Sequence, residues 1–229
     1  MGPYAKEELL ACVIARLLGG ARHAAIGASS PIPATGCFLH REKDKTFRVS
    51  LQQRRAANPF TEGSRELFDL AGQGRIDTFF LGGAQIDGTG AINLVRADGR
   101  RFPGSFGSAF MYPMVPGTIL FREEHSRRTL VPEVDFVSAR GTPRALLTGK
   151  ALFSWQRERK RFRLESFHDS SQEEIAELTG FEYDVSPELR QTPAPTAEEL
   201  ALLRGPVAKL VAADYPDFAR RVWGTTLAA

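Results

Sequence analysis

The chain has 229 residues, 42% of them hydrophobic, which fits a globular protein with one large domain or two small ones. Its formal net charge is only +3, because 30 basic and 27 acidic residues are interleaved, so the charge predicts no nucleic-acid partner. No apolar window is long enough for a membrane span, and the first residues lack a signal-peptide pattern. Cys12 and Cys37 lack disulfide-framework or zinc spacing, so we expect no metal site and a cytoplasmic location.

The first predicted element is an amphipathic helix over residues 6–18, with Glu7 and Glu8 in the first turn and Gly19-Gly20 at its end. Helical patterns also cover 64–71 and, more weakly, 33–40. Short apolar runs bounded by glycine or proline predict strands at 24–27, 46–51, 76–83, 92–96, 118–121, 134–138 and 145–149. This alternation favours an α/β fold with a mainly parallel sheet.

Residues 151–167 predict an antiparallel hairpin that turns near Arg157 to Lys160. The turn opens the densest basic run of the chain, RERKRFR. We interpret this run as a solvated hairpin, and the alternative is a phosphate-binding strip.

Two helices follow the hairpin, each with a predicted capping box. Ser170 pairs with Glu173 in the first, and Thr196 pairs with Glu199 in the second. A Thr-Pro-Ala-Pro spacer precedes the second helix. We therefore expect one domain over 1–191 and a linker with a helical tail over 192–229.

The motif LGGAQIDGTGAIN follows a predicted buried strand. Paired glycines there, Gly82 and Gly83, let a ligand approach the backbone closely, and Gln85 can orient a polar substrate group. A tight strand-to-loop turn is the alternative interpretation. Signatures of phosphate loops, zinc proteases and serine hydrolases are absent, and we expect each of the four scattered histidines to be a surface or hydrogen-bonded residue.

A second glycine-rich stretch, residues 102–109, reads FPGSFGSA and precedes a predicted short helix. Free amides at Gly104, Ser105 and Gly107 are placed to bind an anion or an oxyanion.

Together these motifs resemble the β subunits of class I coenzyme A transferases, of which glutaconate CoA-transferase is the nearest named type. The family carries a GGAQID-like motif, a GN-x-N segment and a PG-x-GG-A loop, and Ser108 stands here where the family usually has a loop glycine. VDFVSARG, LTGKALF, TGFEYDV and TPAPTAEELALLR resemble later family segments, and KEELLACVIARLL resembles its first helix. The resemblance covers nearly the whole chain.

The resemblance implies a three-layer α/β/α fold with a mainly parallel sheet, extended by a C-terminal hairpin and helical tail. It implies an α-type partner subunit in a hetero-oligomer, coenzyme A as a substrate, and no permanently bound cofactor, metal, nucleic acid or membrane. The substrate-lining residues that it implies are Gly82, Gly83, Ala84, Gln85, Gly104, Ser105 and Gly107.

In such enzymes a glutamate carboxylate at a strand end attacks the thioester carbonyl. The corresponding strand here is TFRVSL, and it is followed by Gln52, whose amide cannot form the covalent intermediate. Glu62, followed by Gly63 in a loop, is the nearby acidic candidate, and an exposed glutamate at a helix start is its structural interpretation. Three hypotheses stay open: a transferase whose carboxylate comes from Glu62 or the partner, a thioester or ring-opening hydrolase that uses water, and a non-catalytic subunit that completes the partner's site.

Overall fold

The protein is described by a computed structural model that covers residues 3–54, 60, 62–97, 99–102, 104–105 and 107–224. The chain divides into two compact units. The first unit comprises residues 1–66, 76–78 and 193–229, and the second comprises 67–75 and 79–192. The predicted partition into 1–191 and 192–229 stays a prediction.

The first unit combines the N-terminal helices, two strands and the C-terminal helices. β1 (His23–Ile26) and β2 (Arg48–Leu51) pair in parallel, with His23 opposite Arg48. The helices are α1 (Lys6–Leu17), α2 (Pro31–Lys43), α6 (Ala197–Leu202), α7 (Ala208–Asp214) and α8 (Pro216–Trp223), with a π-helical turn, η1 (Leu203–Val207), between α6 and α7. The predicted first helix and the helical character of residues 197–223 are therefore confirmed.

Helices α1 and α2 pack closely because Gly36 removes a side chain from their contact. A Cβ atom at Gly36 would lie 2.5 Å from the Ile14 Cγ2 atom and 2.9 Å from the Ala11 carbonyl oxygen. Both cysteines belong to this pair of helices and are buried free thiols. Burial raises the pKa of the Cys12 thiol to about 12, so the thiol stays protonated near neutral pH.

The C-terminal segment is tied to α1 and α2 by ion pairs. The Glu199 carboxylate forms ion pairs with Arg16, whose Nη2 atom lies 2.7 Å from Glu199 Oε2, and with Lys43, whose Nζ atom lies 3.0 Å from Glu199 Oε1. The Arg204 guanidinium donates two hydrogen bonds, of 2.8 and 2.9 Å, to the buried Glu8 carboxylate. Because these pairs join residues more than 150 positions apart, the two ends of the sequence form one folded unit.

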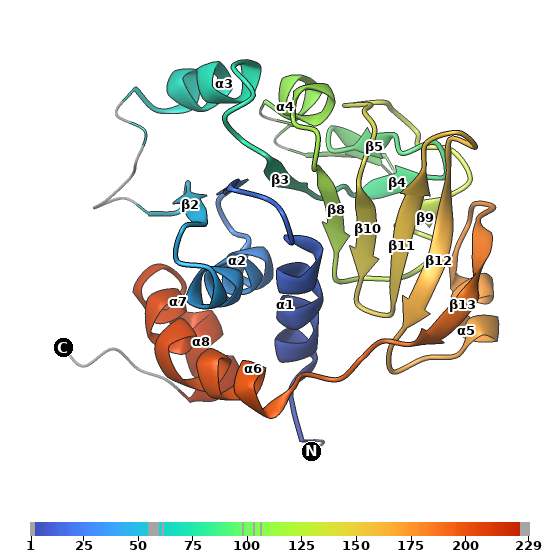
Figure 1. Cartoon of the computed structure of the whole chain (residues 1–229). Helices are drawn as coiled ribbons and strands as arrows, with labels where there is room; N and C mark the ends of the chain where they lie inside the picture. Colours follow the sequence, from blue (N-terminus) through green and yellow to red (C-terminus); the bar gives the residue numbers. More distant parts are fainter. Residues whose placement is uncertain are drawn as a thin grey trace. The chain divides into compact units, whose positions relative to one another are not determined.

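The second unit is built on a mixed sheet, whose strand order is β13-β12-β11-β10-β8-β3. The pairs β3/β8, β8/β10 and β12/β13 are parallel, and β10/β11 and β11/β12 are antiparallel. Figure 1 shows β8, β10, β11 and β12 side by side. Their bounds are β3 (Thr78–Leu81), β8 (Ile119–Arg122), β10 (Ala145–Thr148), β11 (Ala151–Gln156), β12 (Arg161–Phe167) and β13 (Asp184–Gln191). An α/β fold with a mainly parallel sheet is confirmed.

Small sheets and short helices complete this unit. β4 (Gln85–Asp87) lies between β5 (Ile92–Asn93) and β9 (Leu130–Val131), and β6 (Arg96–Ala97) pairs with β7 (Arg100–Arg101). The helices are α3 (Ser64–Gly72), whose first residues belong to the first unit, α4 (Ser108–Met114) and α5 (Gln172–Leu178). Within the described part of the chain, no helix is long and apolar enough to cross a membrane.

The predicted hairpin at 151–167 is confirmed, because β11 and β12 pair antiparallel around a turn at 157–160. Two local predictions are wrong. Residues 134–138 form no strand, and the backbone N–H groups of Val134 and Asp135 instead donate to the side chains of Asp87 and Gln85 in β4. The N-cap of α5 is Ser171, which accepts from the Glu174 amide at 3.2 Å, whereas the hydroxyl of Ser170 donates to the Glu174 carboxylate.

Candidate functional site

The paired glycines form the turn between β3 and β4 in the second unit. A Cβ atom at Gly83 would lie 2.6 Å from the Gln85 carbonyl oxygen, and one at Gly82 would lie 3.1 Å from the Phe121 carbonyl oxygen. The backbone is therefore folded tightly on itself here, and only glycine fits at position 83 without a shift. Gly82 and Ala84 are half-buried and Gly83 is buried.

Gln85 lies in a buried polar cluster. Its Oε1 atom accepts from Asn93 Nδ2 at 2.8 Å and from the Asp135 amide at 3.0 Å. Asn93 also donates to the Arg96 carbonyl and accepts from the amides of Val95 and Arg96. The cluster thus fixes the connection from the glycine turn through β5, and a role of Gln85 toward substrate stays a prediction.

Asp87 closes the other side of the same motif. Its Oδ1 atom accepts from the Thr89 amide and hydroxyl and from the Ala91 amide, and its Oδ2 atom accepts from the Val134 amide at 3.3 Å. The carboxylate is buried and satisfied by neutral donors. The GGAQID stretch is therefore a rigid frame, which Asp87 and Gln85 join to residues 134 and 135.

The second glycine-rich stretch leads into α4. Gly104 adopts a φ of 118°, a conformation that residues with a side chain rarely reach, and is exposed. The Ser105 carbonyl accepts from the amide and hydroxyl of Ser108. A Cβ atom at Gly107 would lie 2.2 Å from the Phe68 ring, so this glycine lets α3 pack against the start of α4. Pro103 and Phe106 lie outside the described residues, and a shared site formed by this stretch and the first motif stays a prediction.

The two catalytic candidates lie in the first unit. Gln52 directly follows β2, and its amide N–H continues the β1/β2 ladder to the Ile26 carbonyl at 3.0 Å. Its Nε2 atom is buried and has no hydrogen-bond partner in the described part of the chain. Glu62 has a side chain that is 67% exposed and lies 3.6 Å from Arg65. That is the setting of a helix-start glutamate, and residues 55–59 and 61 around it lie outside the described residues.

The buried histidines are satisfied by hydroxyl groups, as the sequence predicts. His125 contacts Thr148 Oγ1 at 2.7 Å and Thr179 Oγ1 at 3.1 Å, and His23 contacts Ser50 Oγ at 2.8 Å. Burial lowers the pKa of His125 to about 4, with Lys150 and His168 adding to the effect. His125 is therefore a neutral structural residue near pH 7.

A cleft of about 720 Å³ opens in the second unit, and sequence reasoning did not find it. It is lined by Thr89, Tyr112, Pro113, Val115, Pro116, Arg140, Gly141, Thr142, Trp155, Arg157 and Lys160. These residues come from several separate segments of the chain, so no single sequence motif predicts the cleft. The basic run at the hairpin turn is the one signal that pointed here.

Comparisons with known proteins find CoA-transferase B subunits among the relatives of this chain. No protein-family model matches the chain. The chain is 30% identical to the B subunit of 3-oxoadipate CoA-transferase from Pseudomonas knackmussii over 165 residues, which cover 61% of this chain and 62% of that one. It is 28% identical to the B subunit of glutaconate CoA-transferase from Acidaminococcus fermentans over 148 residues, 55% and 54% of the two chains. The alignments thus span less than two thirds of these curated relatives.

Solved structures extend the likeness along the chain. The structure of glutaconate coenzyme A-transferase from Acidaminococcus fermentans matches with a TM-score of 0.77 at 20% identity, covering 89% of this chain and 94% of that one, and this shows the fold. The chain is therefore similar in sequence to the B subunits of two CoA-transferases and shares the fold of one of them. This transferase-like chain also matches the decarboxylase AibA/AibB, with a TM-score of 0.78 and 26% identity over 96% and 99% of the two chains.

Proposed function

We propose that the protein is the β-type subunit of a class I CoA-transferase, moving coenzyme A between an acyl-CoA and a carboxylate together with an α-type subunit. The observation that carries the proposal is the GGAQID stretch, which folds as a close-packed glycine turn held by Gln85 and Asp87, in a chain similar to the B subunits of two CoA-transferases. Gly82, Gly83, Ala84, Gln85, Gly104, Ser105 and Gly107 are the proposed substrate-lining residues. We also propose a cytoplasmic hetero-oligomer that uses coenzyme A as substrate and keeps no permanent cofactor.

The proposed reaction needs a carboxylate nucleophile. It attacks the thioester carbonyl, the C–S bond breaks, and the CoA thiolate leaves to form a mixed anhydride. The thiolate then attacks the enzyme's acyl carbon, which releases the free acid and leaves an enzyme–CoA thioester. An acceptor carboxylate runs the same steps in reverse, so no further co-reactant is consumed.

Gln52 cannot supply this nucleophile, because an amide forms no such anhydride. Its Nε2 group can only donate hydrogen bonds, and its burial without a partner in the described part of the chain leaves it available to a substrate oxygen. Glu62 is the chain's own candidate, and its exposure means that a partner must cover it before water is excluded from the reaction. The α-type subunit is the other proposed source of the carboxylate.

The decisive experiment uses the chain purified in complex with its α-type subunit. The complex is mixed with an acyl-CoA and a ¹³C-labelled free carboxylate, and the labelled acyl-CoA is measured by mass spectrometry. We expect label to enter acyl-CoA. Hydroxylamine added during turnover would convert an enzyme–CoA thioester into a hydroxamate, and peptide mapping then identifies the glutamate.

The variant Glu62→Gln separates the two sources of the carboxylate. If Glu62 is the nucleophile, the variant loses exchange and the hydroxamate together, whereas Glu66→Gln, in the helix that begins two residues after Glu62, retains both. If the hydroxamate maps to the α-type subunit, Glu62→Gln exchanges label at the wild-type rate. Absence of exchange with every acyl-CoA and acceptor tested would contradict the transferase proposal.

Decarboxylation is the second candidate. It is favoured by the absence of a carboxylate at Gln52 together with the match to a decarboxylase over 96% of this chain. In that reaction a C–C bond breaks, CO₂ leaves, and a proton replaces it, so no nucleophilic glutamate is needed. Release of ¹³CO₂ from a labelled dicarboxylic acyl-CoA, without an acceptor, would support this candidate.

Two further outcomes of the same assay correspond to the remaining alternatives. Free coenzyme A or a ring-opened acyl-CoA formed without an acceptor indicates a hydrolase. Binding of coenzyme A by the complex without turnover indicates a non-catalytic subunit that completes or regulates the partner's site.

A further inference from the structure

The cleft in the second unit has a wall that is fixed before any ligand arrives. Tyr112 is buried, and its hydroxyl donates to the Gly90 carbonyl at 2.8 Å. Its ring packs on Gly141, where a Cβ atom would lie 2.4 Å from the Tyr112 Cδ2 atom. Pro113 and Pro116 add rigid backbone beside it. A preformed wall of this kind lowers the entropy that binding must offset.

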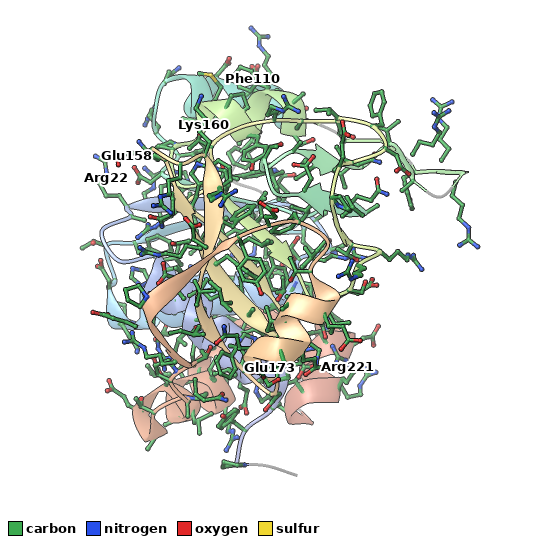
Figure 2. The ribbon with its side chains drawn as sticks, turned by 90° about the vertical axis from the view of Figure 1, so that its right-hand side faces the viewer. Arg22, Phe110, Glu158, Lys160, Glu173 and Arg221 are labelled. Atoms are coloured by element: carbon green, nitrogen blue, oxygen red, sulfur yellow. The ribbon has the colours of Figure 1, made fainter. Side chains whose placement is uncertain are left out.

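Three cationic side chains line this cleft: Arg140, Arg157 and Lys160. Each belongs to an exposed residue, and none has an ion-pair partner in the described part of the chain. Figure 2 labels Lys160 on the turn between β11 and β12. Cations that converge on one concave surface without carboxylates to neutralise them attract an anionic ligand.

The basic run divides into two groups in the structure. Arg159 and Arg161 pair with Asp184 at 2.9 and 3.2 Å, and Arg163 pairs with Glu165 at 2.7 Å. Arg157 and Lys160 instead line the cleft. The solvated-hairpin interpretation therefore fits the ion-paired part of the run, and the phosphate-binding alternative stays a prediction for Arg157 and Lys160.

The cleft also offers an aromatic surface. Trp155 lines it and is half-buried, with its indole edge-to-face against Phe162 at 4.9 Å between ring centroids. Phe162 is fully buried and thereby holds the indole in place. An indole beside cations suits a ligand with a planar ring and phosphates. The volume lies within the range of small-molecule sites.

We propose that this cleft binds an adenosine phosphate, taken as the nucleotide end of coenzyme A, with the phosphates at Arg140, Arg157 and Lys160 and the base on Trp155. The inference rests on the proposed function for the identity of the ligand. The shared chemistry, adenosine with phosphates, has two sources, coenzyme A and free adenine nucleotides, and the experiment distinguishes them.

Binding is measured by calorimetry on the purified chain and on its complex. The probes are adenosine 3′,5′-bisphosphate, coenzyme A, ATP and 4′-phosphopantetheine. We expect the bisphosphate and coenzyme A to bind, more weakly as salt rises, and to quench Trp155 in a Trp223→Phe background. Failure of all four probes to bind overturns the proposal. Binding of ATP without coenzyme A overturns the assignment to coenzyme A.

Variants on one turn provide a matched comparison. Arg157→Gln and Lys160→Gln should each weaken bisphosphate binding roughly tenfold, the value of one charge-assisted hydrogen bond. Arg159→Gln removes the same charge from the same turn, but its side chain pairs with Asp184, so affinity should stay within about twofold. Equal losses of affinity in all three variants would show that only the net charge of the turn matters, and this would contradict a specific site.

The same variants separate this inference from the proposed function. In the complex, Arg157→Gln should raise KM for acyl-CoA and leave KM for the matching acyl-phosphopantetheine unchanged, because the shorter substrate lacks the nucleotide. If bisphosphate binds as expected but no acyl transfer occurs, the proposed function fails and the binding site stands. If transfer occurs with KM unaffected for both substrates, the site fails and the function stands.

Discussion

The two units solve the problem of buried polar groups in different ways. In the first unit, buried carboxylates are paired with cations: Glu199 with Arg16 and Lys43, and Glu8 with Arg204. In the second unit, the buried polar clusters around Gln85 and His125 are held by amide and hydroxyl groups. Charged pairs join distant segments strongly but depend on the ionisation of both partners, whereas neutral bonds fix local loops.

The difference separates the responses of the two units to acid. Burial alone would raise the pKa of Glu199, but hydrogen bonds from Arg16, the Thr196 amide and Lys43 lower it to about 2. A carboxyl pKa below its unfolded value contributes stability above pH 4.5, and this is lost as pH falls toward 2. The pKa of His125 is also lowered, from 6.5 to about 4, so the unfolded state binds the proton first and stability is lost as pH falls from 6.5 to 4.

The largest effect is expected from Glu199→Gln. The variant leaves Arg16 and Lys43 without their carboxylate and should lower the free energy of unfolding by about 4 kcal/mol, the cost of breaking a buried ion pair. Urea unfolding followed by Trp223 fluorescence in a Trp155→Phe background reports on the first unit. Glu198→Gln, on the exposed side of the same helix, is the matched control and should change stability by less than about 0.5 kcal/mol. Similar losses in the two variants would show that the ion pairs are not what holds α6.

The second expectation concerns pH. Neutral burial of His125 should cost the protein about 3 kcal/mol of stability between pH 6.5 and pH 4, since one pKa unit corresponds to about 1.4 kcal/mol. The measurement is unfolding at both pH values, followed by Trp155 in a Trp223→Phe background. His125→Gln should show a correspondingly flatter dependence, and an unchanged slope would argue against a neutral His125.

Asn93→Ala tests the neutral cluster and should destabilise by about 2 kcal/mol, because it removes one of the two donors to Gln85 Oε1 and the acceptor of the Val95 amide. A double-mutant cycle with Gln85→Ala isolates the bond between the two side chains, and we expect a coupling of about 1 kcal/mol. Coupling near zero would mean that the two amides act independently.

The smallest effect is expected at Lys160, whose φ of 49° is left-handed. Lys160→Gly should relieve this strain and stabilise the protein by about 1 kcal/mol, while weakening bisphosphate binding as Lys160→Gln does. Glu158→Gly in the same turn has no such strain to relieve and should destabilise. If both variants stabilise the protein, or if neither does, the left-handed conformation of Lys160 is not a source of strain.

The sequence predicted the elements whose pattern is local. The helix at residues 6–17 and the hairpin at 151–167 follow from periodicity alone. The apolar run at 134–138 failed because Phe136 and Val137 are 46% and 45% exposed, and side chains from β4 replace a strand partner. β13 was missed because Pro187 argues against a strand, although it lies on the last strand of the sheet order, where a missing N–H is tolerated.

The candidate site was harder to read from the sequence. The glycine-rich motifs can be recognised in the sequence, but the hydrogen bonds of their side chains cannot. The sequence therefore could not show that Gln85 and Asp87 hold the neighbouring segments in place. The cleft was missed because Thr89, Tyr112, Arg140 and Trp155 meet only through the tertiary fold. Which cations of the basic run form ion pairs could not be predicted either, because Asp184, the partner of Arg159 and Arg161, lies more than twenty residues later in the sequence.

The pairing of Glu8 with Arg204 has a consequence for synthesis on the ribosome. The two residues are 196 positions apart, so at roughly 5–20 residues per second the carboxylate is made about 10 to 40 seconds before its guanidinium partner. The second unit, in contrast, is almost contiguous along the chain. During translation we therefore expect the second unit to fold first. The N-terminal helix can complete its packing only after the C-terminal segment, which carries the cationic partner of Glu8, has been synthesised.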